Sequence, residues 1–149
     1  MRTPASLAGH PIHPMLVTVP IGLWLFSLVC DVIHVAGSAN PAWPTVALYA
    51  LGGGIVGALI AAIPGLVDLL SLPPGAARRT GLVHMAINLT VVVLYVINLW
   101  LRADAAEVRG APLWLSVIGV ALLGVSGWLG GKLVYVYGVA VEGREVPRA

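Results

Sequence analysis

The chain has 149 residues, of which 59% are hydrophobic and only 9% are charged. Because soluble domains carry about 25% charged residues, this composition indicates a protein whose solvent is the lipid bilayer. The net charge of +2 at pH 7 is too small to indicate a nucleic-acid-binding surface, and the single cysteine, Cys30, excludes an intrachain disulfide and a cysteine-based metal site.

Four apolar stretches are long enough to cross a bilayer, which takes about 20 helical residues. They are predicted at residues 12–36, 44–72, 80–101 and 112–137. Clusters of proline, glycine and charged residues separate these stretches and end helices. Since the connections are short, neighbouring helices are expected to be antiparallel. The sequence therefore predicts an all-α fold, a single transmembrane domain over residues 1–149 that forms an up-down-up-down four-helix bundle.

An even number of spans places both termini on one side of the membrane, together with the connection between the second and third spans. The other side has two basic residues, Arg102 and Arg109. Basic residues concentrate on the cytoplasmic side of membrane proteins, so both termini are expected in the cytoplasm. The basic residues on the side of the termini are Arg2, Arg78, Arg79, Lys132, Arg144 and Arg148.

The first span begins with the run HPIHP. Its histidines, His10 and His13, are three residues apart and are expected on the same side of one helical turn. Pro20 lies inside the span and predicts a kink, as Pro64 does in the second span. Near the far end of the first span, His34 follows Asp31 by three residues, and the two are interpreted as partners.

The second and fourth spans each carry glycines four residues apart, a pattern that lets helices approach closely. This pattern is consistent with a homo-oligomer face, with a contact inside the bundle, or with room for a bulky cofactor. The residues are Gly53 and Gly57 in the second span, and Gly127 and Gly131 in the fourth.

One face of the third span is mostly polar or amphipathic at the helical repeat of about 100° per residue. An amide that faces lipid lacks hydrogen-bond partners, so this face is predicted to line the bundle interior. The residues of this face are His84, Asn88, Val91, Tyr95 and Asn98.

Ionisable groups from all four spans reach the side that carries the termini. His13 and His84 are predicted to face each other across the interior, where two imidazoles can ligate a haem iron. Arg78, Arg79 and Lys132 at the same edge could pair with haem propionates. Because the chain has no CxxCH motif, the predicted cofactor is one non-covalent haem b per chain.

Other polar residues complete the predicted cofactor site. His10 and Asp68 would orient a ligand or hold a propionate, and Asn88 and Tyr135 belong to the same set. Two alternatives stay open: a purely structural polar cluster, or a transition-metal site for zinc, copper or iron formed by His10, His13, Asp68 and His84. No nucleophile–base pair or phosphate-binding loop indicates a hydrolase or transferase, and whether the chain is an enzyme stays open.

Three runs resemble a bacterial membrane family called domain of unknown function 2231. They are GHPIHPMLVTVPIGLW, AAIPGLVDLLSLPPGAARRTGLVHMAINL and SGWLGGKLVYVYGVAV. The resemblance covers nearly the whole chain, although a basic or similar polar residue is expected where Val136 or Tyr137 stands. It implies a multi-pass protein of the bacterial inner membrane, in a family whose domains occur joined to Rieske-type or cytochrome-type redox domains.

The arrangement is also similar to that of small b-type membrane cytochromes, which hold histidine-ligated haem inside a four-helix bundle. This likeness favours electron transfer as the function. Besides the lipid bilayer, the expected partner is a quinone or another redox protein.

Overall fold

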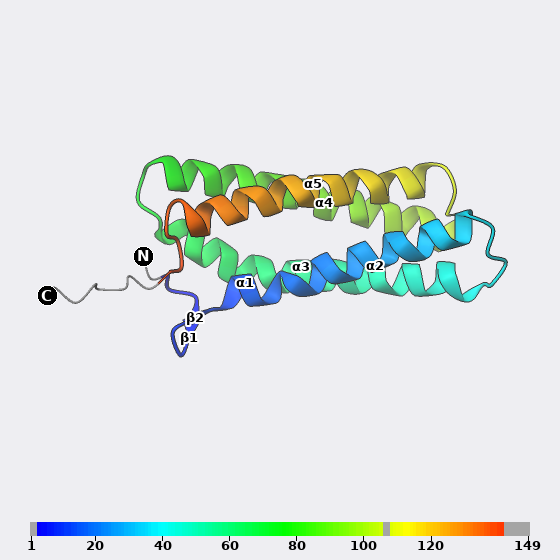
Figure 1. The fold of residues 1–149 in the computed structure, drawn as a ribbon, viewed down its shortest axis with the longest axis horizontal. Helices are drawn as coiled ribbons and strands as arrows, with labels where there is room; N and C mark the ends of the chain where they lie inside the picture. The colour runs from blue at the N-terminus through cyan, green and yellow to red at the C-terminus, as the bar shows by residue number, and fades with distance from the viewer. Residues whose placement is uncertain (1–2, 106–107, 142–149) are drawn as a thin grey trace, which may run out of the picture.

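The computed structural model of the chain describes residues 3–105 and 108–141. Over these ranges, four long helical segments lie side by side and alternate in direction, so the fold is an antiparallel four-helix bundle (Figure 1). All four segments are long and apolar enough to cross a membrane. The predicted all-α transmembrane bundle is therefore confirmed.

The first crossing is made of two helices in succession, and each later crossing is a single helix (Figure 1). A two-stranded hairpin, formed by β1 (Ser6–Leu7) and β2 (His10–Pro11), precedes them. The helices are α1 (Ile12–Leu16), α2 (Thr18–Val35), α3 (Ala42–Ser71), α4 (Ala76–Ala105) and α5 (Ala111–Tyr135).

The β hairpin overturns one prediction about the HPIHP run. His10 lies in strand β2, opposite Leu7, and its side chain is exposed. Pro11 has an extended backbone, with φ −69° and ψ 126°, and a proline disfavours helix at the residue before it. Helix α1 therefore begins only at Ile12, and the expectation that His10 and His13 share a helical turn is wrong.

Pro20 explains why the first crossing is divided. A proline has no N–H for the carbonyl four residues earlier, and its ring crowds that carbonyl, which here belongs to Leu16. Helix α1 ends at Leu16, and α2 begins at Thr18. Pro64, by contrast, lies inside α3, which continues past it to Ser71.

The bundle consists of two helical hairpins: α1 and α2 pack mainly against α3, and α4 packs mainly against α5. Glycines allow the close approach in the first hairpin. A Cβ atom added at Gly53 would lie 3.2 Å from Leu23 Cδ1, and one added at Gly57 would lie 3.1 Å from Val19 Cγ1. These two glycines therefore serve a contact inside the bundle, whereas a Cβ added at Gly127 would meet no atom within 4 Å.

In the middle part of the bundle the two hairpins meet through an aromatic stack between α2 and α4. The rings of Trp24 and Tyr95 are nearly parallel, at 2°, and their centroids are 4.2 Å apart. Trp24 Nε1 donates a hydrogen bond of 3.1 Å to the Leu51 carbonyl. Gly54 and Gly119 make room for the stack, because a Cβ atom at either position would collide with the Trp24 indole or the Tyr95 ring.

Near the far end of the bundle the hairpins are joined by a buried ion pair between α2 and α4. Arg102 Nη1 and Nη2 donate to the two carboxylate oxygens of Asp31, at 2.7 and 2.6 Å. Arg102 Nε donates to Asn98 Oδ1 at 2.8 Å, and Nη2 also donates to Ser116 Oγ at 3.2 Å. Both charged groups are thus paired and hydrogen-bonded, as buried charges must be.

The ion pair overturns two further predictions. Helix α4 extends beyond the predicted end at residue 101, which places Arg102 inside the bundle rather than in a connecting loop. Asp31 is paired with Arg102 and not with His34, because the guanidinium can bind both carboxylate oxygens at once. The buried Nδ1 atom of His34 has no hydrogen-bond partner within residues 3–105 and 108–141.

Because Asp31 balances the charge of Arg102, this arginine no longer counts in the comparison of basic residues at the two ends of the bundle. The other described basic residues are Arg78, Arg79 and Lys132 at the end with the β hairpin, and Arg109 at the opposite end. The predicted basic residues Arg2, Arg144 and Arg148 lie outside the described residues. The excess of basic residues at the hairpin end therefore remains, and it favours that end as cytoplasmic.

Our first prediction is that both termini and the α3–α4 connection face the cytoplasm. In a chain with Cys30→Ala, single cysteines are introduced at two exposed positions, Pro74 in the α3–α4 connection and Ala39 in the α2–α3 connection. A membrane-impermeant thiol reagent added to intact cells should label Ala39→Cys, and it should label Pro74→Cys only after the cells are broken. The reverse pattern would overturn this orientation.

The second prediction concerns the ion pair. Asp31→Asn leaves the buried Arg102 guanidinium without a counter-charge, which should lower the free energy of unfolding by about 3–5 kcal/mol. Thermal denaturation in detergent, followed by helical circular dichroism, measures the loss. The double variant Asp31→Leu/Arg102→Met should recover most of it, because no unpaired charge then remains. Equal stability of Asp31→Asn and the wild type would contradict the prediction.

Candidate functional site

Two histidines from opposite hairpins face each other at the end of the bundle that carries the β hairpin. His13 belongs to α1 and His84 belongs to α4. Their ring centroids are 6.3 Å apart, and the ring planes are nearly perpendicular, at 88°. Both side chains are half-buried. The pair is therefore a contact between the hairpins that lies close to one membrane boundary.

The His13 ring packs against a short segment of α3, and we call the residues that hold a histidine ring in this way its seat. His13 Nδ1 lies 2.8 Å from the Ala61 carbonyl oxygen. A carbonyl only accepts, so Nδ1 carries the proton and the lone pair of the ring lies on Nε2. A Cβ atom added at Gly65 would lie 2.7 Å from Nδ1, so any larger residue there would displace the ring. Gly65 is thus required by the position of His13.

The seat of the His84 ring is formed mainly by α5. His84 Nδ1 lies 2.9 Å from both the carbonyl oxygen and Oγ of Ser126. The amide of Asn88 lies 3.1 Å from His84 Nε2 and donates to the His84 carbonyl at 2.9 Å. This arrangement places the proton on Nδ1 and the lone pair on Nε2, as in His13. Gly130 lies beside the ring, and a Cβ atom added at Gly130 would lie 3.4 Å from Cε1 of His84.

The two imidazoles therefore share one tautomer, in which Nδ1–H donates to a backbone carbonyl. Metal-binding histidines commonly use this arrangement, because the second hydrogen bond fixes the ring and raises the basicity of the other nitrogen. Two metal–imidazole bonds of about 2 Å each place the ring centres about 6 Å apart when both rings point at the same ion. The observed centroid separation of 6.3 Å is close to this value, although Nε2 of His84 is bonded to the Asn88 amide at 3.1 Å in this structure.

The other predicted ligands do not join the histidine pair. Asp68 Oδ1 accepts a hydrogen bond of 2.9 Å from the Ala5 N–H, so this carboxylate holds the N-terminal segment against α3. His10 is exposed on β2. In the described part of the chain, no three or more His, Cys, Asp or Glu side chains gather into a group that could hold a metal ion. The predicted four-residue metal site is thus not assembled there.

The predicted basic residues lie at the same end of the bundle as the histidines. Arg78 and Arg79 lie in the first turn of α4, and Lys132 lies in the last turn of α5. Lys132 Nζ is 5.7 Å from the centroid of the Tyr137 ring. Tyr135 is 89% exposed, so its side chain points away from the bundle interior.

The sequence contained a signal for the far ion pair that the prediction did not use. Arg102 follows His84 by 18 residues, which is five helical turns, so it lies on the inward face already inferred for the third span. Extending that face by one more step would have placed Arg102 in the interior. The contacts that hold the histidine rings, by contrast, depend on Ala61, Ser126 and Gly130, which were not predicted, and on Gly65, which lies in one of the runs that resemble the family.

The model of a protein family described as a predicted membrane protein, DUF2231, matches residues 9–143 of the chain. No curated protein and no solved structure matches the chain. The family match spans both histidines, both of their seats and the far ion pair. The chain therefore belongs to the DUF2231 family of predicted membrane proteins.

Proposed function

We propose that this protein binds one haem b in the bacterial inner membrane and transfers electrons, with His13 and His84 as the axial ligands. The observation that supports the proposal is the facing pair of imidazoles, each with its Nδ1–H on a backbone carbonyl and its lone pair on Nε2. Two unprotonated imidazole nitrogens on different helices are the ligand set of a bis-histidine haem.

The number of ligands favours haem over a bare metal ion. The macrocycle itself supplies four nitrogen ligands, so haem iron takes at most two from the protein. A protein zinc site takes three or four ligands from side chains. The described residues bring together two imidazoles but no group of three or more potential ligands, which fits the requirement of haem.

The surroundings of the pair also suit a haem. His13 and His84 lie on different hairpins, and the contacts between the hairpins are fewer than those within each hairpin. Arg78, Arg79 and Lys132 lie at the same end and would pair with the propionates. Asn88 would release His84 Nε2 to the iron. When bound, the haem supplies one-electron redox chemistry, and the chain holds and orients it.

The electron partner of this site would be a quinone or another redox protein. If the hairpin end is cytoplasmic, the haem lies near the cytoplasmic face of the membrane. A soluble redox protein could then reach it from the cytoplasm, and a quinone could reach it from the bilayer.

The third prediction tests the ligands. The purified protein should show a Soret band and a low-spin haem spectrum, and both His13→Ala and His84→Ala should abolish the low-spin signal. Loss of either imidazole leaves at most a five-coordinate iron. Two histidines outside the pair serve as matched controls: His34→Ala near the far end and His10→Ala on the exposed hairpin should both retain the spectrum.

Three outcomes of this experiment would contradict the proposal. A colourless protein with a stoichiometric metal that is lost in His13→Ala would indicate a bare metal site. A colourless protein without metal would indicate a structural pair. Loss of the low-spin signal in His10→Ala would make His10 a ligand and would require the β hairpin to rearrange.

The fourth prediction concerns Asn88. Asn88→Leu removes the amide that bonds both Nε2 and the carbonyl of His84, which should lower stability by about 1 kcal/mol and reduce the haem bound per chain. Val93→Leu is the control and should change neither quantity, because the Val93 side chain is exposed on the outer face of α4. Haem content is read from the Soret absorbance per protein, and stability from thermal denaturation. Equal effects at both positions would show that Asn88 does not position His84.

A further inference from the structure

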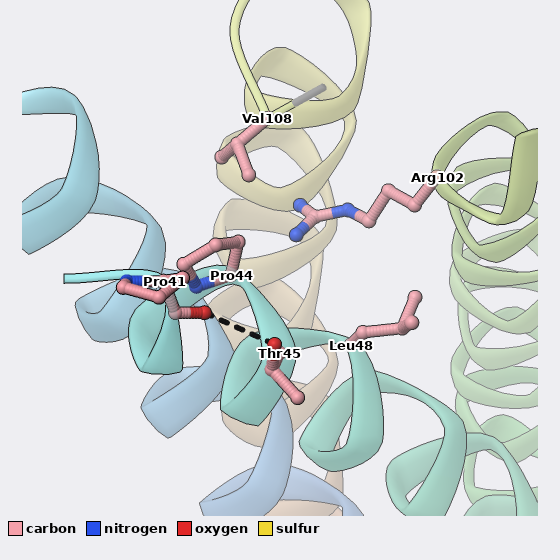
Figure 2. A pocket seen from close by; sticks show the side chains of 6 residues that line it. All are labelled: Pro41, Pro44, Thr45, Leu48, Arg102 and Val108. Atoms are coloured by element: carbon pink, nitrogen blue, oxygen red, sulfur yellow. Dashed lines mark hydrogen bonds between the residues drawn. The ribbon is translucent and has the colours of Figure 1, made fainter. Parts of the chain in front are cut away.

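A pocket of about 230 Å³ lies near the end of the bundle opposite the histidine pair, between the start of α3 and the end of α4. Figure 2 shows the Arg102 side chain extending from α4 toward Val108 and Pro44. Most of the wall is apolar. The lining residues are Pro41, Pro44, Thr45, Leu48, Arg102 and Val108.

Arg102 brings a hydrogen-bond donor to this apolar wall. A guanidinium has five N–H groups. Two of them donate to the Asp31 carboxylate, one donates to Asn98 and one donates to Ser116. The fifth, on Nη1, has no partner among the residues that the structure describes. Thr45 is the other lining side chain with a donor, and its hydroxyl already donates to the Pro41 carbonyl at 3.0 Å (Figure 2).

The charge of Arg102 determines which ligand chemistry fits. The carboxylate of Asp31 binds the guanidinium at both oxygens, so the positive charge is already matched. An anionic ligand would bring an uncompensated negative charge close to Asp31 and is disfavoured. A neutral ligand with a carbonyl acceptor, by contrast, satisfies the remaining N–H of a group that is only 4% exposed.

The size and position of the pocket further limit which ligands can bind. A volume of 230 Å³ is below the range of about 300–1,000 Å³ for pockets that hold drug-sized ligands, so it fits a single substituted ring. The pocket lies at the end of two transmembrane helices, where Pro41 and Thr45 are exposed and an apolar tail can leave toward lipid.

We infer that this pocket binds the head group of a neutral quinone, with one ring carbonyl accepting a hydrogen bond from Arg102 Nη1. The site lies 18 residues from His84 along α4, or about 27 Å at the helical rise, so it is separate from the histidine layer. Binding of the quinone does not require haem, and the inference therefore stands or falls independently of the proposed function.

The test uses the full-length protein in detergent and a benzoquinone that carries one isoprenoid unit, titrated by calorimetry. Thr45→Phe and Leu48→Phe fill the pocket while both members of the ion pair stay in place, and each should weaken binding at least tenfold. Leu59→Phe is the control, since Leu59 lies on the same helix with an exposed side chain. Helical circular dichroism shows that each variant is folded, and the Soret band of the same samples should not change.

A second measurement on the wild-type protein does not depend on any variant. A ring of the same size and tail, with both carbonyls replaced by hydrogens, should bind at least tenfold more weakly than the quinone. A short-chain anionic phospholipid should not displace the quinone.

The inference is overturned if the wild type shows no saturable binding or if Thr45→Phe and Leu48→Phe bind as tightly as Leu59→Phe. It is also overturned if the carbonyl-free ring binds equally well, or if the anionic lipid competes with equal affinity, which would identify a lipid site instead. Loss of haem with retained quinone binding would contradict only the proposed function.

Discussion

The inward face of α4 carries the contacts on which the arrangement of the two hairpins depends. In a bilayer, helices gain little from apolar burial against one another, so packing and polar contacts determine how they associate. Three residues of α4 contact the first hairpin at three depths. They are separated by close to whole numbers of helical turns, so they lie on the same face of the helix. The three contacts are His84 with His13, Tyr95 with Trp24, and Arg102 with Asp31.

These three contacts differ in strength, and the difference gives each a role. The buried ion pair has good geometry, and Arg102 donates additional hydrogen bonds to Asn98 and Ser116, so breaking the pair is costly. Together with the aromatic stack it fixes the rotation and height of α4 against α2. Since α4 is one continuous helix, the same two contacts fix where His84 stands. The histidine layer is thus positioned by one interaction in the middle of the bundle and another near its far end.

The sequence was sufficient for the fold because the lipid solvent leaves few alternatives. Long apolar runs must be helical in a bilayer, and polar residues at the helical repeat must face inward, which correctly placed Asn98 and Tyr95. The sequence was not sufficient at helix ends and turns, where a few neighbouring residues decide between alternative backbone conformations. The end of a helix is uncertain by several residues, and this uncertainty moved Arg102 from a loop into the core. At HPIHP, the three-residue spacing of the histidines favoured a helical turn, whereas the extended backbone of Pro11 places His10 in a hairpin.

The hydrogen bonds at the two ends of the bundle also differ in which hairpins they join. At the far end, Arg102 and Asp31 bond directly from one hairpin to the other. At the near end, His13 Nδ1 bonds to α3 and His84 Nδ1 bonds to α5, so each of these bonds stays within its own hairpin. A pair whose only task was to join helices would gain most from a bond between the two rings. Each imidazole is instead held through Nδ1 by its own hairpin, and Nε2 of His84 accepts a hydrogen bond from Asn88 one turn along the same helix.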